Sequence, residues 1–408
     1  MPEREDQAAR PLRLLLGAFG DPGHVFPLLA LGRALVARGH DVTLQSWAGW
    51  REVAEGEGLR FDEAPEYHVF PTRERPLKPF EAVVRATRDT LPLVRELRPD
   101  VVVADILTLA PALAAELEGV PRATVIPHVF PMGAPGHPPY SMGARIPRTA
   151  LGRRGWDAVS GLVARGEELG RVELNETRRR LGLGPLGWVH GGLSRDLTMV
   201  GTFPQLEYDR PWPEWAHVVG PLLWEPPSDD VELPPGDDPL VLVAPSTSQD
   251  AEHVMLRAAL EGLADLPVRV LATWNRRPPP ADRPLPTPAN ARIVEWVSYA
   301  RTMPRCDVVV CHAGHGTVAR ALASGCAVVA VPSAGDMNEN AARVDWAGVG
   351  VRIPSRLVGP RALRLAVGRA VEDGALRHRA RAVGAWLDHA DPATRAAELV
   401  EALAARGG

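Results

Sequence analysis

Residues 307–324 have the sequence DVVVCHAGHGTVARALAS, in which a glycine-rich turn separates an apolar stretch from an amphipathic one. The pattern predicts a buried strand over Asp307–Cys311 and a helix over Thr317–Ser324. Glycines in such a turn allow backbone N–H groups to approach a ligand closely, and the start of a helix favours negative charge. Because His312 and Thr317 add side-chain donors, the stretch predicts a diphosphate site. The alternative is a purely structural turn in which His312 caps the helix.

Apolar strands and helices alternate on both sides of this turn. Near-continuous apolar strands that alternate with amphipathic helices are typical of a parallel sheet covered on both faces. The expected strands are 12–18, 41–45, 101–104, 123–126, 240–244, 268–272, 307–311 and 328–331, and the expected helices are 27–38, 80–97, 109–117, 253–263, 317–324 and a tail over 361–406.

A proline-rich, acidic stretch over residues 225–239 divides this alternation into two halves. Such a composition is typical of a linker, and the strand pattern restarts directly after it. The sequence therefore predicts an α/β protein with two doubly wound, Rossmann-like domains that face each other across a cleft. We expect an N-terminal domain over 1–222, a linker over 223–239 and a C-terminal domain over 240–385.

Composition and charge exclude several classes of protein. The 408 residues carry a formal net charge of −4, which provides no basic field for nucleic acid. No apolar run approaches the roughly 20 residues that a membrane span needs, and the first 13 residues lack the apolar region of a secretion signal. The three cysteines lack zinc-ligand spacing and are expected to be reduced thiols. We therefore expect a cytoplasmic protein without a metal site.

Two side chains of the N-terminal half are placed to do acid–base chemistry. His24 lies in the loop GDPGHVFP, residues 20–27, and Asp105 follows the strand expected over 101–104. Parallel sheets present functional groups at the carboxyl ends of their strands, where a histidine can act as a base and an aspartate can orient it. Surface or helix-capping roles are the alternatives for both residues. The glycines near this loop lack the G-x-G-x-x-G spacing and no carboxylate follows Gln45, which disfavours a nicotinamide-dependent oxidoreductase.

Two motifs together carry a resemblance to a known family. The loop 20–27 fits G-x-x-G-H-x-x-P, and a second motif runs from Trp296 to about Asn340. In this order and separation they resemble the bacterial family 1 glycosyltransferases of the GT-B fold, which glycosylate natural products such as macrolides and phenolics. The resemblance covers nearly the whole chain, and it implies that a C-terminal helix over 386–408 crosses back to the N-terminal domain.

The resemblance also implies roles for individual residues. His24 matches the base that deprotonates the acceptor hydroxyl, and Asp105 matches its supporting carboxylate. Trp296 matches the aromatic residue that stacks on the nucleotide base, and Asp336 matches the acid that binds sugar hydroxyls. The implied donor-binding residues are Ser246, Thr247, Trp274, Trp296, Val297, His312, Gly314, His315, Gly316, Thr317, Asp336, Met337 and Asn340.

Three residues depart from the family pattern around the donor. Arg320 stands where many members have a glutamate that holds the ribose hydroxyls, and Tyr299 stands where plant relatives have a glutamine. Met337 replaces a glutamine that follows the sugar-binding aspartate, and a thioether does not hydrogen-bond a sugar as an amide does. These departures leave a dTDP-sugar as credible a donor as a UDP-sugar, with glucose as the expected sugar.

Acceptor recognition is expected in the irregular, Pro- and Gly-rich stretches of the N-terminal half. Apolar side chains in such loops commonly line pockets for hydrophobic ligands, although local packing is an equal alternative. Three tryptophans near the linker, Trp212, Trp215 and Trp224, are expected to pack the domain interface. The acceptor-binding candidates are Tyr67, His68, Phe70, His128, Phe130, Met132, Tyr140 and Met142.

The sequence thus favours an inverting, metal-independent glycosyltransferase. It would move a sugar from a nucleoside-diphosphate donor, used as a co-substrate with no other cofactor, to a hydroxyl of a small hydrophobic acceptor such as a phenolic or a polyketide. A nucleotide-sugar epimerase or a non-catalytic helper protein of the same fold is the alternative, and a homodimer is left open.

Overall fold

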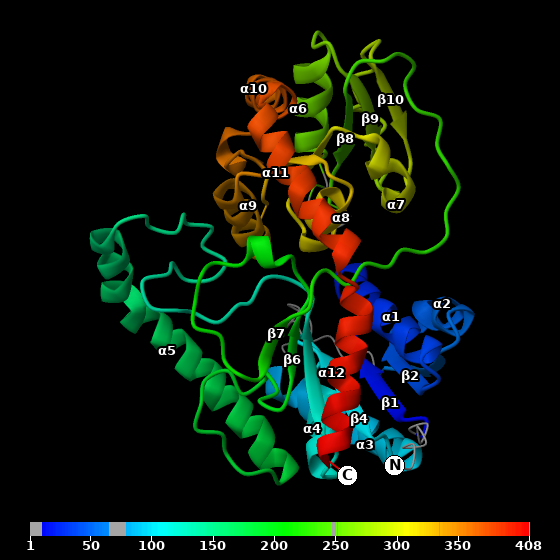
Figure 1. Cartoon of the computed structure of the whole chain (residues 1–408), viewed down its shortest axis with the longest axis vertical. Helices are drawn as coiled ribbons and strands as arrows, with labels where there is room; N and C mark the ends of the chain where they lie inside the picture. The colour runs from blue at the N-terminus through cyan, green and yellow to red at the C-terminus, as the bar shows by residue number, and fades with distance from the viewer. Residues whose placement is uncertain (1–9, 65–78, 247–249, 251, 334, 408) are drawn as a thin grey trace, which may run out of the picture.

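The computed structural model describes residues 10–407 except 65–78, 247–249, 251 and 334. Two parallel sheets form two domains, stacked along the long axis of the molecule (Figure 1). The strand order is β3-β2-β1-β4-β5-β6-β7 in the N-terminal sheet and β10-β9-β8-β11-β12-β13 in the C-terminal sheet. Both orders reverse direction in the middle of the sheet, which confirms two doubly wound, Rossmann-like domains.

The elements of each domain follow one another with short connections. The N-terminal domain contains β1 (Arg13–Gly17), α1 (Pro22–Ala37), β2 (Asp41–Ser46), α2 (Arg51–Gly56), β3 (Arg60–Glu63), α3 (Pro79–Leu97), β4 (Val101–Asp105), α4 (Leu109–Leu117), β5 (Arg122–Ile126), α5 (Ala150–Leu181), β6 (Thr198–Val200) and β7 (Ala216–Val218). The rest of the chain contains β8 (Leu240–Ala244), α6 (Val254–Leu263), β9 (Arg269–Thr273), β10 (Ala291–Val294), α7 (Tyr299–Thr302), β11 (Val308–Cys311), α8 (His315–Ala323), β12 (Ala327–Ala330), α9 (Asp336–Ala347), β13 (Gly350–Arg352), α10 (Pro360–Glu372), α11 (Gly374–Gly384) and α12 (Pro392–Gly407).

Both faces of each sheet are buried, which explains why the strands are apolar without interruption. In β1, Leu14 and Leu16 pack in a core with α1 and α12, whereas Leu15 packs on the opposite face with α3 and α4. In β8, Leu242 faces the core below α8 and α11, and Val243 faces the core below α6 and α10. Successive side chains of a strand point to opposite faces, so a strand covered on both sides needs apolar residues at every position.

The C-terminal helix crosses from one domain to the other. In Figure 1 the helices α11 and α12 run down one side of the molecule from the upper domain to the lower one. Ala396, Val400 and Leu403 of α12 are buried in the N-terminal core beside α1, and Glu401 binds Arg38 and His40 at 2.7 Å. This contact confirms the crossing that the resemblance implied.

The helical tail differs from the prediction because it is divided into three helices. Asp373 ends α10 and caps α11 by accepting the N–H of Leu376, and α12 begins anew at Pro392. Proline suits the first turn of a helix but not its interior, so a break before Pro392 is expected from its chemistry. Two other helices begin earlier than predicted, α1 at Pro22 and α8 at His315.

Two tryptophans that were expected at the domain interface lie elsewhere, and that prediction is wrong for them. Trp212 and Trp215 pack around Phe130 in a cluster of N-terminal-domain residues, with ring centroids 5.2 and 6.3 Å from Phe130. Trp224 is buried in the N-terminal core against Phe26 and donates to Glu57 at 2.8 Å. Position near the linker was a poor guide, because these rings fill the N-terminal domain itself.

Candidate active site

His24 and Asp105 lie together at the carboxyl edge of the N-terminal sheet. Asp105 is the last residue of β4 and is 1% exposed, and His24 is in the first turn of α1. His24 Nδ1 and Asp105 Oδ1 are 2.7 Å apart. Because a carboxylate accepts, the proton lies on Nδ1 of the neutral ring, and Nε2 keeps its lone pair for another partner.

Three other donors fix the Asp105 carboxylate. Oδ2 accepts the N–H of Phe19 at 2.8 Å and the hydroxyl of Thr108 at 2.9 Å, and Oδ1 also accepts the N–H of Leu107 at 3.1 Å. A carboxylate held by this many donors has a defined position and remains charged. His24 therefore meets a buried, oriented anion.

The pKa of His24 reflects two opposing influences. Burial lowers it, but the hydrogen bond and the charge of Asp105 outweigh burial, so the pKa of His24 is raised above its ordinary value. The charge of Asp336, at the start of α9 in the other domain, adds to this rise. His24 therefore faces the donor domain across the cleft.

The predicted diphosphate clamp occupies the turn between β11 and α8. His312 is 6% exposed and accepts the backbone N–H of Ser246 at Nδ1, 3.0 Å away. Burial lowers the pKa of His312, so the neutral ring carries its proton on Nε2, where it can be donated to an anion. An added Cβ at Gly314 or Gly316 would meet nothing within 4 Å, which leaves room for a ligand at the start of α8.

Trp296 and the residues around it form the expected base-binding region. The Trp296 ring is nearly parallel to that of Tyr299, with centroids 6.4 Å apart and an interplanar angle of 15°. The guanidinium of Arg276 lies 4.7 Å from the Trp296 centroid. A nucleotide base that stacks on Trp296 would displace Arg276 or use the other ring face. Val297 is 1% exposed and belongs to the core, so its side chain is not available to the donor.

Asn340 and His315 form a buried hydrogen-bond chain between the domains. Asn340 is 2% exposed, and its amide donates to Ala313 O at 3.0 Å and to Asp336 Oδ2 at 3.3 Å. His315 lies 3.4 Å from Asn340 Oδ1 through Nδ1 and 3.3 Å from the carbonyl of Gly201 through Nε2. The side chains of these two predicted donor ligands therefore hold Asp336 and the N-terminal domain in place. They are not directed at a donor as expected.

Replacing His315 with alanine tests this positioning role. Burial lowers the pKa of His315 to about 4, so the ring is neutral near pH 7 and donates to one of its two oxygen neighbours. We expect kcat to fall roughly tenfold, the equivalent of one hydrogen bond of about 1–1.5 kcal/mol, with the dissociation constant of dTDP unchanged. His315→Gln, which keeps an N–H donor, should recover most of the loss. A weakened dTDP affinity with kcat intact would show direct donor binding instead.

The acceptor candidates are divided between a loop surface and the core. His128 and Tyr140 are half-buried and 3.1 Å apart, Nδ1 of His128 also lies 2.8 Å from the carbonyl of Val129, and Met142 is exposed. Burial is the first cause that lowers the pKa of His128, and the charges of Asp336, His24 and Asp105 also act on it, which places it near the candidate base. Phe130 is 1% exposed and packs in the N-terminal core, so the prediction that it lines a pocket is wrong. Met132 is half-buried beside the same cluster. Tyr67, His68, Phe70 and Thr247 lie outside the described residues.

An ion network that the sequence did not predict joins the domains. Arg343 of α9 donates to Glu339 at 2.8 Å, to Glu207 at 3.2 Å and to the carbonyl of Leu206 at 3.0 Å. Its guanidinium also lies 3.5 Å from the centroid of the Tyr208 ring. The Glu339–Arg343 spacing suits a helical pair, but nothing in the sequence marks Glu207, 136 residues away, as its partner.

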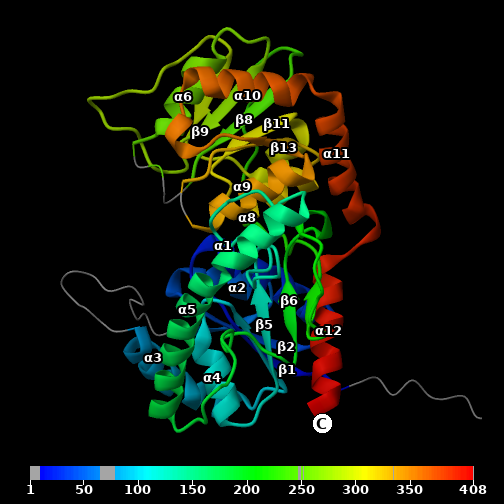
Figure 2. The same cartoon turned by 90° about the vertical axis from the view of Figure 1, so that its left-hand side faces the viewer.

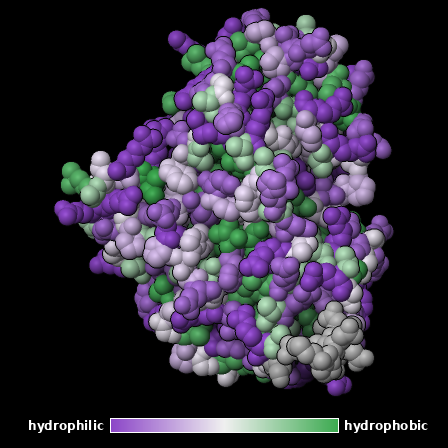
Figure 3. All heavy atoms as spheres, in the orientation of Figure 1, coloured by the Kyte–Doolittle hydropathy of each residue, from purple (hydrophilic) through white to green (hydrophobic). Residues whose placement is uncertain are grey.

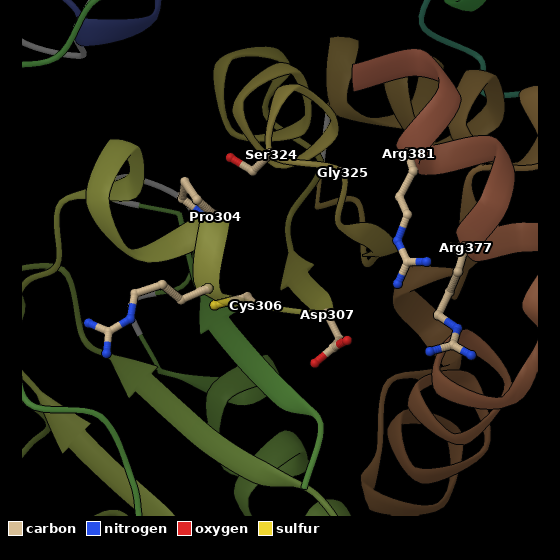
Figure 4. Close-up of a pocket in the computed structure, with 8 residues that line it drawn as sticks. Pro304, Cys306, Asp307, Ser324, Gly325, Arg377 and Arg381 are labelled. Carbon is tan, nitrogen blue, oxygen red and sulfur yellow. The ribbon is translucent and has the colours of Figure 1, made fainter. Parts of the chain in front are cut away.

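A second hollow, shown in Figure 4, lies at the amino end of β11. Arg377 and Arg381 of α11 flank it, and Cys306 and Asp307 lie at its base. Burial raises the pKa of the Cys306 thiol to about 12, so this cysteine stays protonated. Ligands of doubly wound sheets bind at the carboxyl ends of the strands, which makes this hollow a poor candidate for the active site.

Two Rossmann-like domains, a linking C-terminal helix and an acid–base pair facing a glycine-rich anion site define a GT-B glycosyltransferase. Comparison with known proteins agrees with this class. Residues 257–405 match the family described as erythromycin biosynthesis protein CIII-like, C-terminal domain. The chain is thus a glycosyltransferase of the natural-product type, with a C-terminal domain of that family.

Relatives and solved structures cover nearly the whole chain. 4'-Demethylrebeccamycin synthase from Lentzea aerocolonigenes is 26% identical over 96% of this chain and 99% of its own. O-mycaminosyltylonolide 6-deoxyallosyltransferase from Streptomyces fradiae is 28% identical over 91% and 93%, respectively. The structure of the glycosyltransferase VinC in complex with dTDP is 19% identical and covers 97% of this chain and 100% of VinC, with a TM-score of 0.70. No helix among the described residues is long and apolar enough to cross a membrane.

Proposed function

We propose that this protein transfers a sugar from a nucleoside-diphosphate donor to a hydroxyl of a small hydrophobic acceptor, with inversion at the anomeric carbon. The observation that carries the proposal is the His24–Asp105 pair, 2.7 Å apart, in the cleft that also contains the clamp histidine and Asp336. A helper protein without activity has no need of an oriented, basic histidine there. An epimerase has no evident use for a hydroxyl-activating base.

The transfer follows from where the protons lie. Nε2 of His24 takes the acceptor proton while the acceptor oxygen forms a bond to the anomeric carbon. The bond between that carbon and the diphosphate oxygen breaks on the opposite face, and its electron pair leaves with the diphosphate. Asp105 stabilises the resulting imidazolium, and the Nε2–H of His312 and the N–H groups at the start of α8 stabilise the leaving group. Because these groups neutralise the departing charge, the proposed step uses no metal ion.

We propose a dTDP-sugar as the donor. Burial lowers the pKa of Arg320, and the charge of Glu225 acts against this, so Arg320 lies near that carboxylate and provides no carboxylate of its own for a ribose. The dTDP complex of VinC, which has the same fold, supports a deoxyribose nucleotide. Glucose is the first sugar to test. A 6-deoxy sugar is the second, because one relative is named a 6-deoxyallosyltransferase.

The proposed acceptor site lies on the N-terminal side of the cleft, near His128, Tyr140 and Met142. The loop that carries these residues is fastened to the donor domain, since Arg145 pairs with Asp345 at 2.8 Å and Arg352 donates to the carbonyl of Gly143. A phenolic or polyketide acceptor would therefore lie between this loop and Asp336. The three cysteines are free and buried, which supports a reducing, cytoplasmic compartment.

Thermal unfolding with dTDP, UDP and NAD tests the donor class. A nucleotide at about 100 times its dissociation constant adds roughly 2.7 kcal/mol, or several degrees at about 2–4 °C per kcal/mol. We expect a shift with dTDP that His312→Ala loses and His24→Ala retains. A shift with NAD alone would overturn the proposal, and no shift with any nucleotide would favour the helper. With dTDP-glucose and a phenolic acceptor, retention of the anomeric configuration in the product would contradict inversion.

A further inference from the structure

The long helix α5 exposes an apolar stripe that nothing in the chain covers. Its 32 residues lie along the edge of the molecule in Figure 1 and across the front in Figure 2. Five of the twelve exposed large apolar residues in the described part of the chain belong to it. They are Leu151, Val159, Leu162, Leu169 and Val172, which are 79%, 38%, 68%, 68% and 53% exposed, respectively. Figure 3 shows apolar side chains at the outer end of this helix, on the left of the view.

The exposed side chains share one face of the helix. At 100° per residue, Leu151, Leu162 and Leu169 lie within about 20° of one another around the helix axis, and Val159 and Val172 flank them. A helix face with this spacing is typical of one that packs against another helix. The stripe is therefore organised, in contrast to scattered exposed residues such as Leu357 and Leu365 elsewhere.

The middle of α5 is weak without a partner. Its ends are fastened, since Asp157 accepts the N–H of Gly136 at 2.6 Å and Arg178 binds Glu116 at 2.7 Å. Between them, four exposed glycines would each accept a Cβ with nothing within 4 Å: Gly155, Gly161, Gly166 and Gly170. Each exposed glycine disfavours a helix by about 1 kcal/mol relative to alanine, so packing must supply stability that helix propensity does not.

We propose that α5 is a dimerisation surface and that its occupant is the α5 helix of a second copy of this chain, packed antiparallel. With the pairing centred near Ser160, Leu151 meets the partner subunit's Leu169, and Ala158 meets the partner subunit's Leu162. Two-fold symmetry makes each contact twice, as an isologous interface requires.

The charges beside the stripe favour this arrangement over a parallel one. Arg153 and Arg154 lie towards the start of the helix, and Glu167 and Glu168 lie towards its middle. In the antiparallel register Arg154 lies beside the partner subunit's Glu168, so opposite charges meet on both sides of the two-fold axis. A parallel pairing would place like charges together, which is unfavourable.

Sedimentation of the full chain at micromolar concentration tests the proposal. We expect the mass of two chains for the wild type and of one chain for Leu162→Glu combined with Leu169→Glu, with unchanged circular dichroism. Leu365→Glu, an equally exposed leucine on α10, is the matched control and should remain a dimer. A wild-type chain that sediments as a monomer would overturn the proposal, whether or not another protein binds the stripe.

Charge exchange tests the register. Arg154→Glu should shift the dimer towards monomer through repulsion, and Arg154→Glu with Glu168→Arg should restore it. A dimer that is indifferent to both changes, or that survives the double leucine variant, would place the interface elsewhere. Because the readout is mass, its outcome is independent of whether the proposed transfer reaction is correct.

Discussion

Replacing His24 with alanine is expected to lower kcat by about 10²–10⁴-fold, the usual contribution of a general base. The acceptor hydroxyl would then have to lose its proton to water, because no other described residue shares the contact of His24 with Asp105. The measurement is initial rate at saturating dTDP-glucose and acceptor. The dTDP-induced shift in unfolding temperature should persist, since His24 belongs to the acceptor side of the cleft.

The pH profile of the wild type provides a second test of the same role. A base must be unprotonated, and the pKa of His24 is raised above its ordinary value, because the hydrogen bond and charge of Asp105 together exceed the lowering by burial. Activity should therefore fall as the pH is lowered through a value above 6.5. His128→Gln is the matched histidine control, because it lies in the same cleft and should leave this acidic limb in place. Wild-type turnover in His24→Ala would remove the base from the mechanism.

The sequence was sufficient to predict the parts of the molecule that depend on local pattern. Both faces of each sheet are covered, so apolar runs such as Val101–Ala104 identified the strands and their order along the chain. The position of Asp105 followed from the same rule, because the residue after a buried parallel strand lies at the ligand-binding edge. That His24 would lie 2.7 Å from it was implied by the family resemblance and is visible only in the structure.

Side-chain direction and pairing across domains could not be predicted from local pattern. His315 lies in the glycine-rich turn beside the clamp, yet its ring turns away to the carbonyl of Gly201, 114 residues distant. Phe130 lies in a loop rich in proline and glycine, where an aromatic ring can equally line a pocket or fill a core, and three-dimensional packing decided for the core. Glu207 carries no signal at all, since its buried charge makes sense only beside Arg343.

Asp105→Asn is expected to lower kcat by about 10³–10⁴-fold while leaving the shape of the site nearly unchanged. The amide removes the negative charge that stabilises the imidazolium, and its oxygen must now satisfy donors that two carboxylate oxygens shared. If the amide nitrogen faces His24, it donates to Nδ1 and forces the proton onto Nε2, where it blocks the acceptor hydroxyl. The loss should therefore appear in kcat, with the affinity for dTDP preserved.

A loss of stability could imitate part of this result, and the pH profile separates the two. Phe19, Leu107 and Thr108 all donate to Asp105, and one buried donor left without an acceptor costs about 1–3 kcal/mol. Asp100→Asn, at the opposite end of the same strand where Asp100 accepts from Arg13 at 2.8 Å, should lower the unfolding temperature without altering kcat. In Asp105→Asn the acidic limb of the remaining activity should move to lower pH, because burial alone then acts on the His24 pKa. An acidic limb that stays in place would mean that Asp105 does not act through His24.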